Sequence, residues 1–567
     1  MSQTAAKPGR AGEAIRLAAV AAFALFVALA GLSALPPLDR DEARFAQASA
    51  QMLETGDFVT IRFQDAERNK KPAGIYWLQA ASVSAFSSVE AREIWAYRLP
   101  SVLGAVLAAI FTYLAGARLY GARAGFLAAL LLAASPALAA EATIAKTDAF
   151  LLATICMAQA AFIHIFAGWK EGAGKGWLWP LVFWAGLGAG ILVKGPIAPM
   201  IVGLTGLFLF IRTPNAGWIW AMRPLTGLAV LILMIAPWAI AIGYATEGRF
   251  FTEAIGADMV AKLGEAQESH SGPPGYHLAL VWILLWPAGA LLIPGLMRAF
   301  ATRAAWPSWF LLAWIVPGWI VFELTATKLP HYTLPLYPAL AILAARAAAA
   351  GAAGAAGVAG AASRRRLIGR LASLLYAGVG LAVAVLVAAL PHIFGASGLT
   401  PLCYAAAVLI AAGSLVIAAM FLKGRAYEGG LAASCLAALV AWTVLGGVLP
   451  GLDRLMISPR LSAALDRAGY HALRDGAPPT ALAGYSEPSA VFLLGTASLL
   501  TDAGGAARHL AEAPGSAAVV EARLEDEFRA ACASLALEPQ VLAVVDGLNY
   551  SKGRNVSLTV FTAGKRP

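Results

Sequence analysis

The sequence has few charged residues for its length. Charged side chains make up 13% of its 567 residues, and hydrophobic residues make up 60%. Soluble proteins carry about 25% charged residues, so this chain has too little charge to cover a soluble body of its size. Lipid must therefore be part of its solvent. The same composition excludes a disordered, collagen-like or nucleic-acid-binding protein.

Cysteine is also scarce, and nucleotide-binding loops are missing. The sequence contains no G-x-x-x-x-G-K-[ST] or G-x-G-x-x-G segment. Its four cysteines show neither paired spacing nor a metal pattern, and three lie in apolar runs, where a free thiol acts as a small buried hydrophobe. We expect neither a disulfide framework nor a cysteine metal site from Cys156, Cys403, Cys435 and Cys532.

Apolar runs long enough to cross a membrane recur along the chain. A helix needs about 20 apolar residues to cross roughly 30 Å of hydrocarbon. The first run follows Lys7, Arg10 and Arg16 and has no small-residue cleavage site before Asp39, which favours a retained anchor over a removed signal. Hydropathy predicts about thirteen spans, at 15–35, 97–117, 124–140, 148–168, 177–193, 196–211, 224–244, 277–297, 305–323, 333–350, 371–391, 401–422 and 431–450.

The basic residues predict how these spans are oriented. With a cytoplasmic N-terminus, every predicted inner loop holds at least a pair of cations, as the positive-inside bias requires. The loops 36–96 and 245–276 and the tail 451–567 then lie outside, in a Gram-negative periplasm. The tail segments "SAAVVEA", "VLAVVDG" and "VSLTVFTA" are typical of short strands. We therefore expect an α-helical polytopic membrane domain over 1–450 and a small periplasmic α/β domain over 451–567.

Acidic and cationic motifs gather in the first outer loop. It begins with "PPLDRDEARFAQASAQMLETGDFVTIRFQ", which places Asp41, Glu42 and Arg44 just beyond the first span. An ordinary helix start with acids in its first turn is the alternative explanation. The segment "NKKPAGIYWLQAASVSAF" follows, with Lys71 and Tyr76. A snorkelling lysine and an interfacial aromatic residue would explain that segment equally well in isolation.

The order of the motifs D-E-x-R, M-L-x-x-G-D and K-P-x-x-x-Y-W resembles membrane glycosyltransferases of GT-C architecture. These are the protein O-mannosyltransferases and, more closely, the 4-amino-4-deoxy-L-arabinose transferases of lipid A. The resemblance covers essentially the full length and continues through "TIAKTDAFL", "LVKGP", "SHSGPPGYHLALVWILLWP", "TKLPHYTLPLYPALAIL" and "NYSKGRNVSLTVFTA". It implies an inner-membrane enzyme that moves a sugar, such as that aminoarabinose, from a polyprenyl phosphate to a periplasm-facing acceptor, lipid A or another glycolipid or protein.

The carrier phosphate of such a reaction requires cations. Lys71 is the first candidate, because it matches the lysine of the family's K-P motif. Arg44, Lys194 and Lys328 are further candidates, since each lies at a predicted outer end of a span. Snorkelling or a structural role remains open for both Lys194 and Lys328, although a cation held within a membrane protein is costly without a partner.

Asp41 is the candidate for orienting or deprotonating the acceptor, and it would act mainly through its placement. Glu42 and Asp148 are the other predicted catalytic acids, and an ordinary N-cap explains Asp148 about as well. The remaining residues expected to line the substrate cavity are Tyr76, His270, Tyr276, His331 and Tyr332.

A metal site is left open by the sequence. The related transferases have a glutamate directly before the K-P lysine and a distant histidine, which together can ligate a divalent ion. Here Lys70 occupies the glutamate position. His270 is present, but a lone histidine is more often a hydrogen-bonded structural residue than a ligand. A divalent metal is therefore the one cofactor under consideration.

Two other functional classes stay open. A transporter or flippase of a lipid-linked or anionic substrate would show repeated broken helices and ionisable groups at the midplane. Here the ionisable groups concentrate at one outer face, without a convincing internal repeat. A non-catalytic scaffold would leave the outer Asp and Lys residues unexplained. The sequence favours a transferase.

Overall fold

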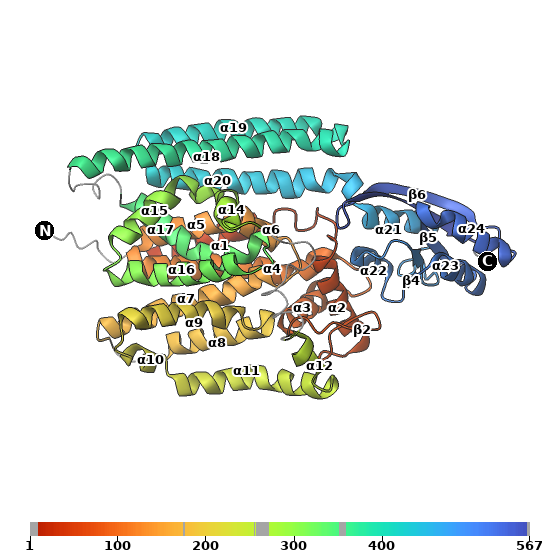
Figure 1. Ribbon diagram of the computed structural model, residues 1–567, viewed down its shortest axis with the longest axis horizontal. Helices are drawn as coiled ribbons and strands as arrows, with labels where there is room; N and C mark the ends of the chain where they lie inside the picture. The colour runs from red at the N-terminus through yellow and green to blue at the C-terminus, as the bar shows by residue number, and fades with distance from the viewer. Residues whose placement is uncertain (1–9, 174–175, 255, 257–271, 351–358, 564–567) are drawn as a thin grey trace.

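The computed structural model describes residues 10–173, 176–254, 256, 272–350 and 359–563. A body of roughly aligned helices carries a smaller domain at one end, and we call this end of the body the tail-side end (Figure 1). The body contains α1 (Arg10–Ala28), α4 (Ile94–Tyr120), α5 (Ala122–Ala133), α6 (Pro136–Ala142), α7 (Asp148–Lys170), α8 (Leu178–Lys194), α9 (Ile197–Arg212), α10 (Gly217–Ala221), α11 (Pro224–Ala245), α14 (Tyr276–Leu284), η3 (Trp286–Ala288), α15 (Gly289–Ala301), α16 (Trp306–Leu324), α17 (Tyr337–Ala349), α18 (Ala359–Phe394), α19 (Thr400–Leu422) and α20 (Ala426–Thr443).

Eight described helices are long and apolar enough to cross a membrane, or up to ten if each of two bent pairs forms one span. The bent pairs are α5 with α6, at 60°, and α14 with η3 and α15, at 87°. Proline explains both bends, because Pro136 and Pro287 cannot continue the preceding helix. The other expected spans fall on α8, α9 and α17, which are only 17, 16 and 13 residues long.

Helix α7 forms the centre of the body, and 83% of its most apolar 18-residue stretch is buried. Small residues let its neighbours approach closely, as is usual between membrane helices. At Gly104 of α4, an added Cβ would lie 2.7 Å from the backbone of Ala149. By contrast, only 17% of the most apolar 18-residue stretch of α11 is buried, so this helix forms one lipid-facing edge of the body, with α18 and α19 at the opposite edge (Figure 1).

The C-terminal domain is built on one mixed five-stranded sheet in the order β4-β3-β5-β7-β6. Strand β3 pairs in parallel with β4 and β5, while β7 is antiparallel to both β5 and β6. This confirms the expected small α/β domain. Its elements are η9 (Asp453–Leu455), α21 (Ile457–Ala468), β3 (Ala481–Ala483), α22 (Pro488–Leu494), β4 (Leu499–Thr501), α23 (Ala503–Glu512), β5 (Ala517–Glu521), η10 (Ala522–Leu524), α24 (Glu525–Ser534), β6 (Gln540–Asn549) and β7 (Arg554–Thr562).

A layer of short elements lies between the helical body and this domain (Figure 1). It comes mostly from the first loop and contains α2 (Asp41–Thr55), β1 (Arg62–Phe63), β2 (Ala66–Glu67) and α3 (Gly74–Phe86), joined by α12 (Arg249–Phe251) and η4 (Pro330–Leu336). Helix α2 is polar on average yet mostly buried, because it contacts body and domain at once. This layer positions the residues that the sequence motifs singled out.

Candidate active site

A cavity of about 790 Å³ lies at the tail-side end of the body. Its walls come from α2, the segment 68–72, the start of α7, the α8–α9 junction, α11, α12, the end of α16 and η4. Segments far apart in the chain therefore converge on one hollow. Seven of the twelve predicted site residues line it: Asp41, Arg44, Lys71, Asp148, Lys194, His331 and Tyr332.

The described wall is charged at one end and apolar at the other. Cations outnumber acids among its side chains, which gives the hollow a positive potential that favours an anion. The apolar part runs along α9, α11 and α16, next to the lipid-facing edge. The charged residues are Arg40, Arg44, Arg68, Lys70, Lys71, Lys146 and Lys194, together with Asp39, Asp41 and Asp148.

Asp148 and Lys194 form the ion pair at the floor of the cavity. Lys194 Nζ donates to Asp148 Oδ1 at 2.5 Å. Asp148 is the first residue of α7, and Lys194 is the last residue of α8. An acid at a helix N-terminus and a cation at a helix C-terminus are both favoured by the helix dipoles. Gly195, at φ 63°, lets the chain turn directly into α9 and keeps Lys194 at this depth.

Lys146, Glu141 and His331 extend this pair into a buried network. Lys146 Nζ lies 3.0 Å from Glu141 Oε2 and 3.6 Å from Asp148 Oδ2. Burial alone would lower the pKa of Lys146, but the two carboxylates raise it above its ordinary value. His331 lies 3.6 Å from Glu141 and 3.7 Å from Asp148. Burial and the nearby Lys146 lower the pKa of His331 to about 3, so its ring is neutral at physiological pH.

Asp41 lines the cavity from α2, as the exposed first residue of that helix. The N-terminus of α2 stabilises its carboxylate. Arg44 lies one turn further along the same helix and also lines the cavity. Lys71 enters from the turn that precedes α3, where its Nζ donates to the carbonyl of Lys70 at 3.0 Å. The site thus combines an accessible carboxylate with a group of cations in one cavity.

Comparison with known proteins agrees with this architecture. Residues 70–240 match the family model described as dolichyl-phosphate-mannose-protein mannosyltransferase. The chain is 29% identical over 326 residues to the undecaprenyl phosphate-alpha-4-amino-4-deoxy-L-arabinose arabinosyl transferase of Pseudomonas aeruginosa, covering 55% of this chain and 57% of that protein. It is 27% identical over 307 residues to the protein of the same name from Yersinia pestis, covering 53% and 54%. The chain thus spans little more than half the length of these curated relatives.

Two solved structures establish the fold. ArnT from Cupriavidus metallidurans, bound to undecaprenyl phosphate, gives a TM-score of 0.74 at 20% identity and covers 98% of this chain and 100% of that chain. The archaeal oligosaccharyltransferase AglB from Archaeoglobus fulgidus gives 0.50 at 13% identity, covering 98% and 75%. The chain has the GT-C fold. This confirms the expected fold class, while the family model and the curated relatives confirm the family resemblance expected from the motifs.

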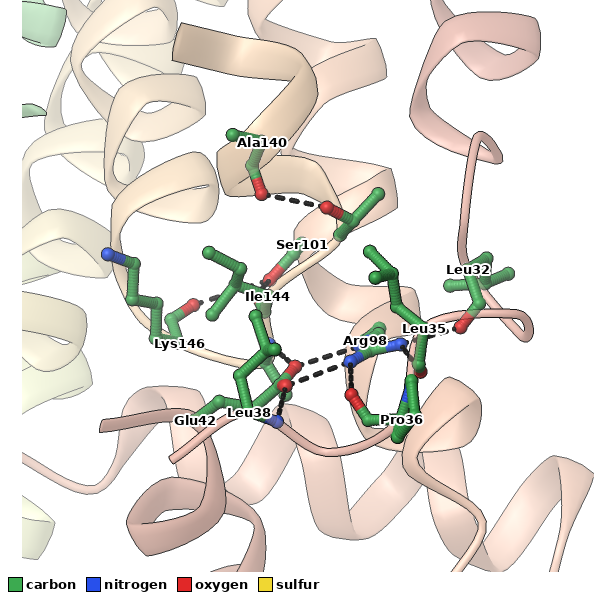
Figure 2. A network of polar contacts seen from close by, with 12 residues as sticks. Leu32, Leu35, Pro36, Leu38, Glu42, Arg98, Ser101, Ala140, Ile144 and Lys146 are labelled. Atoms are coloured by element: carbon green, nitrogen blue, oxygen red, sulfur yellow. Dashed lines mark hydrogen bonds and ion pairs between the residues drawn. The ribbon is translucent and has the colours of Figure 1, made fainter. Parts of the chain in front are cut away.

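Glu42, predicted to be a catalytic acid, is absent from the described cavity wall and instead belongs to a buried structural network (Figure 2). Its two carboxylate oxygens accept from Nε and Nη2 of Arg98, each at 2.8 Å. They also accept from the backbone N–H groups of Leu38 and Ala145 at 2.8 and 2.7 Å. Glu42 therefore joins this loop to α4 and to the segment before α7.

Tyr76, Lys328 and Tyr276 also fall outside the described lining of the cavity. Tyr76 is fully buried beneath it, where its hydroxyl accepts from Arg68 at 2.8 Å. Lys328 turns away, and its Nζ donates to the carbonyl of Gly272 at 3.1 Å. Tyr276 begins α14 and packs edge-on against His277, with 5.2 Å between ring centroids.

Sequence reasoning missed several cations of the wall, among them Arg40, Arg68 and Lys146. Lys146 had a usable signal, because it lies two residues before Asp148 in the "TIAKTDAFL" motif. Arg40 and Arg68 stood close to predicted residues, but no pattern distinguished them from ordinary interfacial cations. Arg68 is held over the ring of Phe45 at 4.8 Å.

The described residues contain no group of three or more His, Cys, Asp or Glu side chains placed to hold a metal ion. His270, the histidine considered as a ligand and as a cavity residue, lies outside the described residues, as does half of the loop 245–276. Lys70, at the position of the family's glutamate, lines the cavity as a cation. A cation there supports anion binding rather than metal ligation.

Proposed function

We propose that this protein is a polyprenyl-phosphate-dependent glycosyltransferase of the bacterial inner membrane, with its cavity facing the periplasm. The observation that carries the proposal is the convergence of the cationic wall with Asp41 and Asp148 in one cavity. The sugar we assign is 4-amino-4-deoxy-L-arabinose, because the curated relatives are named as transferases of this undecaprenyl phosphate-linked sugar. The acceptor we assign is lipid A, which the resemblance of the sequence motifs implies.

The two halves of the cavity suit the two halves of such a donor. The prenyl chain would lie against the apolar wall of α9 and α11, which includes Met200, Ile235 and Ala239. The phosphate would meet the cations of the loop and of the α8–α9 junction, Lys71 and Lys194 first. Charge-assisted hydrogen bonds from these groups hold a phosphate and stabilise it as it leaves.

In the proposed reaction an acceptor oxygen attacks the anomeric carbon of the sugar. The bond from that carbon to the phosphate oxygen breaks, and the bonding electrons leave with the polyprenyl phosphate. A phosphate acceptor of lipid A is already anionic and needs no base, so Asp41 would orient the amino group of the sugar. A hydroxyl acceptor would give its proton to Asp41. In both cases Asp41 acts mainly through placement.

The position of these groups also supports a transferase over a transporter or flippase. The charged residues of the described cavity wall come from the start of α2 and its preceding loop, the segment 68–71, the start of α7 and the end of α8, all at the tail-side end of the body. A transporter would place such groups near the bilayer midplane, between repeats.

Transfer by the purified protein tests the proposal. The protein in detergent is given undecaprenyl phosphate-linked aminoarabinose and lipid A, and mass spectrometry follows the modified lipid. We expect transfer by the wild type, and at least a hundredfold loss in Asp41→Ala and in Lys71→Ala. Lys423→Ala is the control, because this exposed lysine follows α19 far from the cavity lining. Wild-type transfer by either cavity variant would refute the site assignment, and an inactive wild type would refute the function.

A further inference from the structure

The C-terminal domain forms hydrogen bonds with the two residues that immediately precede Asp41. The backbone N–H of Asp39 donates to the hydroxyl of Tyr550 at 2.5 Å. The guanidinium Nη2 of Arg40 donates to the carbonyl oxygen of Ser551 at 2.8 Å. Both partners lie in the turn between β6 and β7, within the tail motif "NYSKGRN". Asp39 and Arg40 themselves line the cavity.

Arg40 has a backbone conformation that residues other than glycine rarely adopt. Its φ is 65° and its ψ is −99°, at the position that caps the N-terminus of α2. Such a conformation persists only where surrounding contacts hold it, and it is most common at functional sites. The contact to Ser551 is therefore in the right place to hold Arg40 in this conformation and to fix the direction in which α2, with Asp41 and Arg44, begins.

The turn that makes these contacts is itself held in place. Asn549 Oδ1 accepts from the backbone N–H of Lys552 at 3.1 Å. Asn549 Nδ2 donates to the buried Glu487 at 2.8 Å, and Lys552 Nζ lies 3.8 Å from the same carboxylate. On the other side, the backbone N–H of Ser489 donates to Asp39 Oδ1 at 3.1 Å. The domain thus holds the β6–β7 turn firmly against Asp39 and Arg40, which we call the cavity rim.

We propose that the β6–β7 turn is a positioning element of the candidate active site. Tyr550 and Ser551 hold Asp39 and Arg40, so that Arg40 faces the donor phosphate and α2 presents Asp41 to the cavity. The proposal rests on the proposed function and gives the C-terminal domain a part in it. Tyr550 is a positioning residue, since it acts through Asp39 and Arg40.

Tyr550→Phe tests this, because it removes only the hydroxyl that accepts from Asp39, on a side chain that is 41% exposed. Tyr404→Phe is the matched control. Tyr404 is 47% exposed, and its hydroxyl makes one hydrogen bond, to His392, on the α18–α19 pair. Hydrogen exchange of the peptide that contains Asp39 and Arg40 measures how firmly these two residues are held. Titration with undecaprenyl phosphate measures the affinity of the cavity for the donor phosphate. Thermal unfolding of the intact protein confirms that each variant is folded.

In Tyr550→Phe we expect about three- to tenfold faster exchange at Asp39 and a similar loss of undecaprenyl phosphate affinity, as the loss of one hydrogen bond predicts. Tyr404→Phe should match the wild type in both assays. The double variant Tyr550→Phe/Arg40→Ala should bind undecaprenyl phosphate no more weakly than Arg40→Ala, because Tyr550 acts through Asp39 and Arg40. A general structural defect would instead lower the affinity of the double variant further.

Unchanged exchange at Asp39, unchanged affinity in Tyr550→Phe, or additive losses in the double variant would each overturn the proposal. A wild type that binds no undecaprenyl phosphate would refute the proposed function instead. In that case the exchange rate at Asp39 alone decides whether the turn holds the rim.

Discussion

Replacing Glu42 by glutamine should destabilise the protein strongly. Arg98 is fully buried, and its guanidinium donates five hydrogen bonds: two to Glu42 and one each to the carbonyls of Leu32, Leu35 and Pro36 (Figure 2). Glu42 is the only acid among these partners. Glu42→Gln therefore leaves a buried guanidinium without a counter-charge and turns one amide N–H₂ toward other donors.

The expected size of this effect follows from the burial of the pair. Removing one partner of a buried ion pair costs about 3–5 kcal/mol. At an unfolding entropy of about 2.1 cal/mol/K per residue, this lowers the thermal midpoint of a chain of this length by roughly 3–4 °C if it unfolds as one unit. Thermal unfolding of the detergent-purified protein measures the change. Glu13→Gln is the control, because Glu13 is an exposed acid in α1.

The double variant Glu42→Leu/Arg98→Met separates charge from packing. It removes the buried charge but leaves three carbonyls without their donor and the backbone N–H groups of Leu38 and Ala145 without their acceptor, so we expect only partial recovery of the midpoint. A thermal midpoint of Glu42→Gln equal to that of the wild type, together with lost transfer, would refute the structural role and restore Glu42 as a catalytic candidate.

Three further predictions concern the rim, the buried network and the helix packing. Burial, and then the carboxylate of Glu487, raise the pKa of Asp39 from its usual 3.8 to about 6, so its ionised form is the one that folding disfavours. At pH values above about 6, Asp39→Asn should therefore have a higher thermal midpoint than the wild type, and this difference should disappear as the pH falls toward 3.8. An equal difference at pH 4 and pH 8 would contradict this. Lys146→Met should lower stability by about 3–5 kcal/mol, because Glu141 and Asp148 lose the cation between them; unfolding at the wild-type temperature would contradict it. Gly104→Leu should lower the midpoint by roughly 1–3 °C, because its Cβ meets the α7 backbone at 2.7 Å and such over-packing costs about 1–3 kcal/mol; a midpoint unchanged from the wild type would show that the helices separate freely.

Much of the fold could be predicted because its signals are local. Hydropathy located every expected span on a helix or a bent pair, and strand-like segments of the tail fall on β5, β6 and β7. Hydropathy could not show the 87° bend at Pro287 or that α17 has only 13 residues, because such details depend on how neighbouring helices pack.

The candidate site was predictable only where a motif marked it. Asp41, Lys71, Asp148 and Lys194 stood in motifs and line one cavity. Glu42 stood in the same motif as Asp41, but its partner Arg98 lies 56 residues away and carries no pattern of its own. Which of two adjacent acids faces the cavity depends on the direction of α2, and only the folded chain fixes that.

The contact of the C-terminal domain with Asp39 and Arg40 could not be predicted from the sequence either. Asp39 and Tyr550 are separated by 511 positions. The motif "NYSKGRN" could be recognised as part of the family resemblance, but its contact with the residues before Asp41 follows only from docking of the C-terminal domain on the first loop.

The most direct test of the central claim is a comparison of two lipids that differ only in the phosphate. Purified protein is titrated with undecaprenyl phosphate and with undecaprenol, and binding is followed by native mass spectrometry. If the cavity cations hold the donor phosphate, the wild type binds undecaprenyl phosphate at least tenfold more tightly than undecaprenol, and Lys71→Gln loses most of that preference. Equal binding of the two lipids by the wild type, or an unchanged preference in Lys71→Gln, would contradict the account.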